Sequence, residues 1–120
     1  MMKSWDVSCN DSAWQVLGET TRSQAVMMTV MEDDNKDGPI VRLANADQWL
    51  YVVGGNGEAI VNGITLPLWS GTLVLIEAGD SFEIRSAEGS ALRSVSFFMP
   101  PMKFPEAVTE QLRHPKPEML

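Results

Sequence analysis

Short apolar segments separated by turn signals make up most of the chain, from residue 24 to residue 99. The segments are rich in β-branched and aromatic residues, whereas Gly, Asn, Asp and Ser cluster between them. Strands of about five residues with a turn about every 8–12 residues indicate a sandwich or a barrel. Helical crossovers have no room between them, so we expect an all-β fold without a parallel sheet. The expected strands cover residues 24–31, 40–44, 48–53, 58–61, 64–69, 72–77, 81–85 and 91–99.

The segments on either side of these strands suggest the domain organisation. A chain of 120 residues fits one compact domain. Residues 1–23 are polar and contain Trp5 and Trp14, which we expect to anchor an N-terminal arm on the body. Residues 24–99 form the predicted β-barrel domain. Residues 100–120 form a C-terminal tail, in which Pro105 precedes a short predicted helix over 106–113.

Charge and composition limit the possible partners. The 16 acidic and 9 basic residues give a formal net charge of −7, whereas a nucleic-acid partner requires a basic surface. The sequence begins without an apolar stretch of signal-peptide length, and no segment approaches the ~20 apolar residues of a membrane-spanning helix. Cys9 is the only cysteine, which fits a reducing compartment. We expect a cytoplasmic protein with neither a nucleic-acid nor a membrane partner.

Glycines and turns between residues 48 and 82 have the spacing of two known motifs. The first motif ends with Glu, six residues and Gly, and Gln48 and Gly55 have this spacing. The second begins with Gly, five residues and a Pro-x-Gly turn, and Gly71 is followed after five residues by Glu77-Ala78-Gly79. With this framework, residues 24–99 resemble the cupins, a family of small double-stranded β-helix or jelly-roll barrels. The resemblance implies an all-β jelly-roll barrel.

The same motifs in cupins hold a transition metal with three histidines and a glutamate, and these ligands are missing here. Gln48 stands at the glutamate position, and Phe82 stands at the position of the third histidine. The paired histidines would fall at residues 42 and 44 or at 41 and 43, and neither pair contains a histidine. One neutral amide is a weak ligand, and the fixed charge of Arg42 repels a cation. We therefore expect no metal, no cofactor and no metal-dependent reaction.

A barrel interior with a mixed polar and apolar lining remains. If Gln48 points inward, the period-two alternation of a strand also turns Leu50 inward, and the same relation joins Phe82 to Ile84. An arginine would bind a carboxylate while a phenyl ring supplies an apolar wall, which suits a small organic anion or a planar polar molecule. The predicted ligand-binding residues are Arg42, Gln48, Leu50, Phe82, Ile84 and Ser96.

Three of these residues also have a purely structural interpretation. Phe82 would belong to the core, because aromatic side chains dominate protein cores. Gln48 would satisfy a buried backbone group, as buried amides often do. Arg42 would lie on the rim in water, which is the usual place for an arginine. The sequence leaves these alternatives open.

Three classes of function are compatible with the sequence. The first, which we favour, is non-catalytic binding of a small molecule by a metal-free barrel. The second is an enzyme that uses no metal, or a metal held by non-standard ligands. Its acid–base chemistry would depend on carboxylates such as Glu77, Asp80 or Glu83, none of which stands at motif spacing from a base. The third is a purely structural homodimer.

A homodimer is also expected from the resemblance, because cupins commonly pair through an outer sheet face or a swapped N-terminal strand. The N-terminal arm of this chain is available for the second arrangement. Aromatic residues are enriched at protein interfaces, so Trp49, Tyr51 and Trp69 would form a subunit contact if they lie on an outer face. The alternative is that the three side chains pack within the domain.

Overall fold

The computed structural model describes residues 2–6, 14–31, 41–42 and 45–102, and within them all regular secondary structure is β-strand. The strands β2, β6 and β9 have the predicted bounds, and β4, β5, β7 and β8 differ from the prediction by one or two residues at an end. The helix predicted over 106–113 lies outside the described residues. Within the described residues no helix is long and apolar enough to cross a membrane. The strands are β1 (Trp14–Glu19), β2 (Gln24–Met31), β3 (Val41–Arg42), β4 (Asp47–Gly54), β5 (Asn56–Val61), β6 (Ile64–Trp69), β7 (Leu73–Ile76), β8 (Ser81–Ser86) and β9 (Ala91–Met99).

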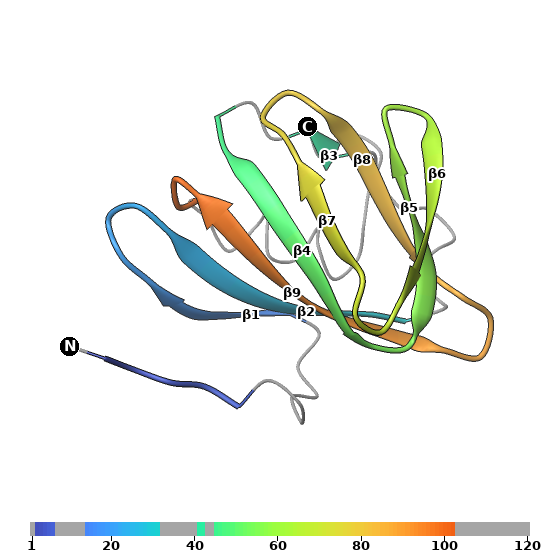
Figure 1. Ribbon diagram of the computed structural model, residues 1–120, viewed down its shortest axis with the longest axis horizontal. Coiled ribbons are helices and arrows are strands. Elements are labelled where there is room, and N and C mark those ends of the chain that lie inside the picture. Colours follow the sequence, from blue (N-terminus) through green and yellow to red (C-terminus); the bar gives the residue numbers. More distant parts are fainter. Residues whose placement is uncertain (1, 7–13, 32–40, 43–44, 103–120) are drawn as a thin grey trace.

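The strands form two antiparallel sheets that face each other (Figure 1). The larger sheet has the order β1-β2-β9-β4-β7, and the smaller sheet has the order β3-β8-β5-β6. From β6 onward, the chain passes from one sheet to the other at every connection. The inner faces of both sheets are therefore buried against each other. In the described residues no helix covers either outer face.

The sequence does not predict β1, which falls inside the segment 1–23 expected to be an arm. This strand pairs antiparallel with β2 and forms one edge of the larger sheet. The ring of Trp5 lies against Gly18, because a Cβ atom at Gly18 would be 2.7 Å from Cη2 of Trp5. The contact is the kind of anchor expected of Trp5, whereas the side chain of Trp14 lies outside the described part. The division of the chain after residues 23 and 99 stays a prediction.

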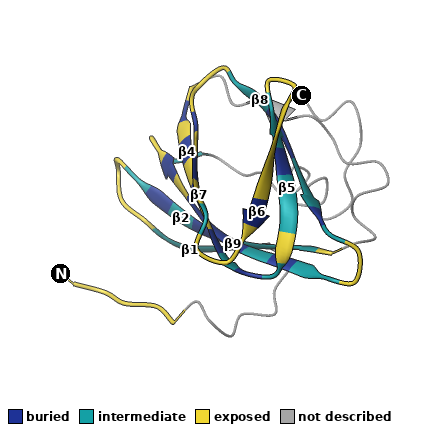
Figure 2. Cartoon of the chain, turned by 45° about the vertical axis from the view of Figure 1, so that its right-hand side comes forward, coloured by how far each residue is buried: buried dark blue, intermediate teal, exposed yellow. Residues whose placement is uncertain are grey.

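The core lies between the two sheets (Figure 2). Along β4, Gln48, Leu50 and Val52 are buried, whereas Trp49 and Tyr51 are exposed, which confirms the predicted alternation. Inner-face residues of both sheets form one apolar cluster. Its members are Leu50, Val52, Ala59, Leu68, Val74, Ile76, Phe82 and Leu92.

Strand β6 is an edge of the smaller sheet. Among the strands of that sheet whose side chains are described, it is the most exposed. Ile64, Leu66 and Leu68 share one face of β6, but only Leu68 is buried, with 1% of its surface exposed. Leu66 is 38% exposed and Ile64 is 65% exposed. Pro67 lies within this edge strand, opposite Glu58 of β5. Proline has no N–H to donate, which restricts it to such edge positions.

The turn between β5 and β6 is tied to the turn between β7 and β8. Asn62 and Gly63 have φ angles of 50° and 81°, as the predicted Asn-Gly hairpin turn requires. Asn62 Nδ2 donates to Asp80 Oδ1 at 2.9 Å, and the Glu77 N–H donates to Asp80 Oδ2 at 2.9 Å. The hydrogen bond from Asn62, and then the one from Glu77, lower the pKa of Asp80 because they stabilise its carboxylate.

We expect Asp80→Asn to destabilise the protein at neutral pH and to have less effect in acid. A lowered folded-state pKa contributes stability that is present above the ordinary value of 3.8 and is lost as the pH falls through the folded-state pKa. Thermal unfolding of both proteins at neutral pH and at about pH 2.5 measures this difference. The gap between their Tm values should narrow in acid, and a gap of constant size would contradict the assignment.

Candidate functional site

Buried polar side chains interrupt the apolar inner face of the larger sheet. Gln48 of β4 and Ser94 and Ser96 of β9 point into the space between the sheets, and each is at most 1% exposed. These residues are brought together because β4 pairs antiparallel with β9, with Leu50 directly opposite Ser96 and Gln48 opposite Phe98. Burial of polar groups is costly unless they are hydrogen-bonded, so this group requires an account of its partners.

One end of the Gln48 amide is satisfied and the other is not. Gln48 Nε2 donates a hydrogen bond to Ser96 Oγ at 2.8 Å, between diagonal neighbours across β4 and β9. Gln48 Oε1 is fully buried and has no hydrogen-bond partner among the described residues. The hydrogen bond that Gln48 Nε2 donates is therefore to a side chain, whereas the structural interpretation of the sequence expects a bond to a backbone group. An unsatisfied buried acceptor costs about 1–3 kcal/mol, which a donor from a bound molecule or a water would offset.

The structure places the other predicted site residues as follows. Leu50 and Phe82 belong to the apolar cluster, and Ile84 packs against it. Phe82 is 7% exposed, so it is a core residue, as in the structural interpretation of the sequence. Arg42 lies on β3 opposite Ser81 of β8, but its side chain lies outside the described part of the structure. Within the described residues, the predicted residues joined by a hydrogen bond are Gln48 and Ser96.

The side chains at the motif positions do not fit a transition metal. Gln48 offers one amide oxygen and Phe82 offers no donor, whereas such ions take several imidazole or carboxylate ligands. The described residues contain no group of three or more His, Cys, Asp or Glu that could hold an ion. Residues 41–44 contribute neither imidazole nor carboxylate.

The carboxylates that an acid–base mechanism would need lie outside the barrel interior. Glu77 and Asp80 lie in the turn between β7 and β8, where Asp80 is occupied by the two hydrogen bonds described above. Glu83 follows Phe82 on β8, and consecutive side chains of a strand point to opposite faces of the sheet. Because Phe82 points inward, Glu83 points to the outer face. There it accepts a hydrogen bond from Arg85 Nε at 2.7 Å, and this bond raises the pKa of Arg85.

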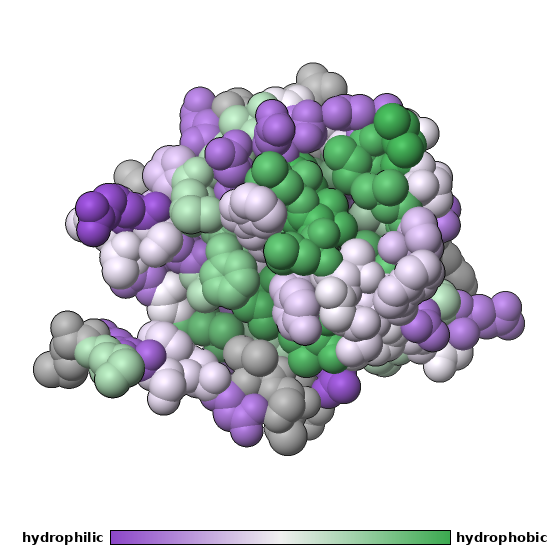
Figure 3. Space-filling view, in the orientation of Figure 1, coloured by the Kyte–Doolittle hydropathy of each residue, from purple (hydrophilic) through white to green (hydrophobic). Residues whose placement is uncertain are grey.

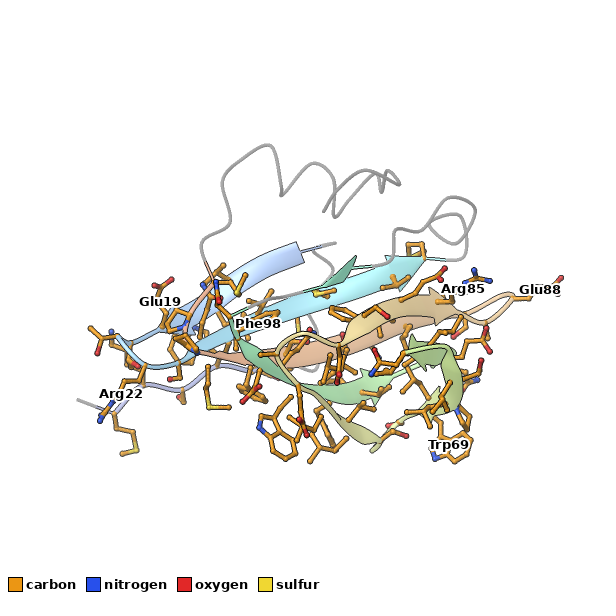
Figure 4. All side chains as sticks on the ribbon, turned by 90° about the horizontal axis from the view of Figure 1, so that it is seen from above. Glu19, Arg22, Trp69, Arg85, Glu88 and Phe98 are labelled. Atoms are coloured by element: carbon orange, nitrogen blue, oxygen red, sulfur yellow. The ribbon has the colours of Figure 1, made fainter. Side chains whose placement is uncertain are left out.

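The surface of the protein has a depression of about 350 Å³ at one end of β5 and β8. Arg85 and Glu58 line it from neighbouring strands. Figure 4 shows Arg85 at the end of the molecule that carries Glu88, away from Phe98. Because Phe98 is the partner of Gln48 on β9, this depression is separate from the buried polar group.

Ser94 is the member of the buried polar group that the predicted site omits. It lies on the same face of β9 as Ser96 and faces Met28 and Val52 on the neighbouring strands. Its Oγ donates to the Met28 carbonyl oxygen at 3.4 Å. The alternation that placed Ser96 inward applies equally to Ser94, so the sequence contained the signal.

Two antiparallel sheets with these strand orders and crossing connections define a jelly roll, which confirms the fold class expected from the sequence. The site that this jelly roll contains is a buried amide and hydroxyl pair, Gln48 and Ser96. No protein-family model matches the sequence, and no curated protein matches it.

Solved structures match the chain in three dimensions. An RmlC-like cupin from Desulfovibrio desulfuricans has a TM-score of 0.70 and 17% identity, over 85% of this chain and 100% of that one. A cupin protein from Bacteroides fragilis has a TM-score of 0.67 and 14% identity, over 88% and 91%. A predicted oxalate decarboxylase from Thermotoga maritima has a TM-score of 0.57 and 15% identity, over 68% and 69%. The chain therefore has the cupin fold.

Proposed function

We propose that the protein is a metal-free, non-catalytic barrel that binds a small organic molecule next to Gln48. The observation that carries this proposal is the buried Gln48 Oε1. In the part of the chain that the structure describes it has no hydrogen-bond partner, although Nε2 of the same amide is bonded to Ser96. Buried polar atoms in native proteins are nearly always paired, so an unpaired one requires an explanation, and a bound molecule or a water that completes the bond is one. The proposed setting is the cytoplasm.

The free acceptor determines the chemistry of the ligand. Gln48 Oε1 can only accept a hydrogen bond, so the ligand must present an N–H or O–H donor. Leu50 and Phe82 supply apolar surroundings in the same core, which favours a small planar molecule with one polar edge. Arg42 would add affinity for a ligand that also carries a carboxylate.

We expect an amide such as benzamide to bind the wild-type protein and to lose about tenfold or more in affinity with Gln48→Leu. Benzoate has a carboxylate but no hydrogen-bond donor, so it tests Arg42 separately. The comparison is between its affinity for the wild-type protein and its affinity for Arg42→Ala. Isothermal titration calorimetry with a panel of small planar amides and carboxylates, including these two, measures both effects.

Gln24→Leu is the matched control, because Gln24 is also a buried glutamine, at 4% exposed. Both ends of its amide are satisfied by the backbone of Met102, at 3.0 Å and 3.2 Å, so this substitution should leave ligand affinity unchanged. Equal affinity of wild type and Gln48→Leu for every amide in the panel would refute the proposal. Equal affinity of wild type and Arg42→Ala for benzoate would remove Arg42 from the site.

An enzyme remains the second candidate, because one similar solved structure is a predicted oxalate decarboxylase. Against it, the inward-facing side chains described on β4, β8 and β9 include no carboxylate that could act as a base. Elemental analysis of the purified protein separates the two candidates. A stoichiometric transition metal would favour the enzyme, and its ligands would have to come from positions other than those of the cupin motifs.

A further inference from the structure

The depression of about 350 Å³ at the end of β5 and β8 opens on the outer face of the smaller sheet. Glu58 of β5 and Arg85 of β8 line it from directly opposite positions. Their strand neighbours Ala59 and Ile84 lie in or against the apolar cluster between the sheets, so Glu58 and Arg85 point outward. The volume lies within the roughly 300–1,000 Å³ of small-molecule sites.

One edge of the Arg85 guanidinium is fixed and the other is open. Arg85 Nε donates to Glu83 Oε2 at 2.7 Å, and Glu83 is only 8% exposed, so water competes little for this bond. Within the described residues the Arg85 side chain forms no other hydrogen bond. Its two Nη groups therefore remain available in a fixed orientation, and 43% of the side chain is exposed. Paired N–H groups of this kind bind a carboxylate with two parallel hydrogen bonds.

Glu58 does not take part in this ion pair. Although Glu58 stands directly opposite Arg85, its carboxylate forms neither a hydrogen bond nor an ion pair with any described residue. The hydrogen bond to Glu83 contributes most to the raised pKa of Arg85, the charge of Glu83 follows, and the charge of Glu58 raises this pKa further. The depression therefore places an unpaired negative group beside the open edge of a positive one.

The backbone beneath the two charged groups is held in place. The Ala87 N–H donates to the Asn56 carbonyl oxygen at 2.9 Å, which continues the pairing of β5 with β8 beyond the end of β8. Gly57 and Ser86, which also line the depression, are partners in the same pairing. A site formed on paired strands needs little ordering when a molecule binds.

We propose that this depression binds a zwitterion of the class of free α-amino acids, with the ligand carboxylate on the Nη groups of Arg85 and its ammonium group on Glu58. A ligand with both charges satisfies both groups, whereas Glu58 repels a simple anion and Arg85 repels a simple cation. The net charge of −7 disfavours an anion further. Figure 3 shows hydrophilic side chains at the end of the molecule that carries the turn between β8 and β9, so a charged ligand meets polar surroundings there.

An NMR titration of the isotope-labelled full chain with L-alanine tests this proposal. We expect saturable shifts of the Gly57 and Ala87 amide signals, with a Kd of about 1 mM. Acetate and methylammonium, which each carry one of the two charges, should bind at least about tenfold more weakly. Glu58→Gln keeps the shape of the side chain but removes its charge, and it should weaken L-alanine binding by about tenfold or more.

Arg85→Lys is a second test of the same contact. Lysine retains the positive charge beside Glu83 but lacks the two Nη groups, so this variant should also weaken L-alanine binding by about tenfold. Circular dichroism should show that both variants are folded, and Glu58→Gln decides the outcome if Arg85→Lys does not fold.

Glu88→Gln is the matched control, because it removes a carboxylate from the same end of the molecule. Glu88 lies at the end that carries Arg85 (Figure 4) but does not line the depression, so the affinity for L-alanine should be unchanged. An absence of saturable shifts in the wild type, equal affinity for acetate and L-alanine, or an unchanged affinity of Glu58→Gln for L-alanine would overturn the proposal.

Discussion

Replacement of Gly55 by alanine is expected to destabilise the protein by about 2–5 kcal/mol, through two effects that add. Gly55 has a φ of +82°, a conformation that costs a residue with a Cβ about 1–2 kcal/mol. A Cβ atom at this position would also lie 2.1 Å from the carbonyl oxygen of Ala91. That oxygen belongs to the backbone of β9 and cannot rotate away, so overpacking adds about 1–3 kcal/mol.

Gly71→Ala separates the two effects. Gly71 has a φ of +96°, but a Cβ atom there would meet nothing within 4 Å. This variant should lose only the conformational part, about 1–2 kcal/mol. Urea unfolding followed by circular dichroism measures both losses. Equal losses of stability in the two variants would show that the close approach of β9 does not restrict the residue at position 55.

A comparable loss is expected from Leu68→Ala, which should destabilise the protein by about 2–5 kcal/mol. Leu68 is 1% exposed and belongs to the apolar cluster between the sheets, so its truncation leaves a cavity that the surrounding strands cannot fill. The free energy of unfolding from urea titration is the direct measurement, provided that unfolding is reversible and two-state.

Leu66→Ala is the matched control for this loss. Leu66 lies two residues earlier on the same face of β6 but is 38% exposed. Its truncation should cost about 1 kcal/mol or less, because much of its surface already contacts water. If both variants lost the same stability, the core would extend further along β6 than the buried areas indicate.

The strands and turns of this protein could be predicted because they depend on local properties. Asn62 and Gly63 adopt the positive φ angles that asparagine tolerates and that glycine, which lacks a Cβ, permits. Gln48 and Leu50 alternate with exposed neighbours. Strand β1 was missed because its sequence, WQVLGE, has neither clear alternation nor a run of β-branched residues. Its place at the edge of the larger sheet depends on pairing with β2, which no local pattern encodes.

The candidate site could be predicted only in part, because it depends on a pairing between distant segments. Alternation indicates that Gln48 and Ser96 both point inward. Their contact requires the register of β4 against β9, which joins residues 48 positions apart in the sequence. The free acceptor of Gln48 follows from the same register and from the surrounding apolar cluster.

Pro67 has a consequence for how copies of this chain can assemble. A β-strand that approached the free edge of β6 would lose one ladder hydrogen bond at this residue, because proline has no donor to offer. Edge-to-edge growth adds one chain after another without limit and leads to fibrils, whereas stacking across a two-fold axis stops at a pair. The proline at this edge therefore opposes open-ended polymerisation while leaving closed association through sheet faces unaffected.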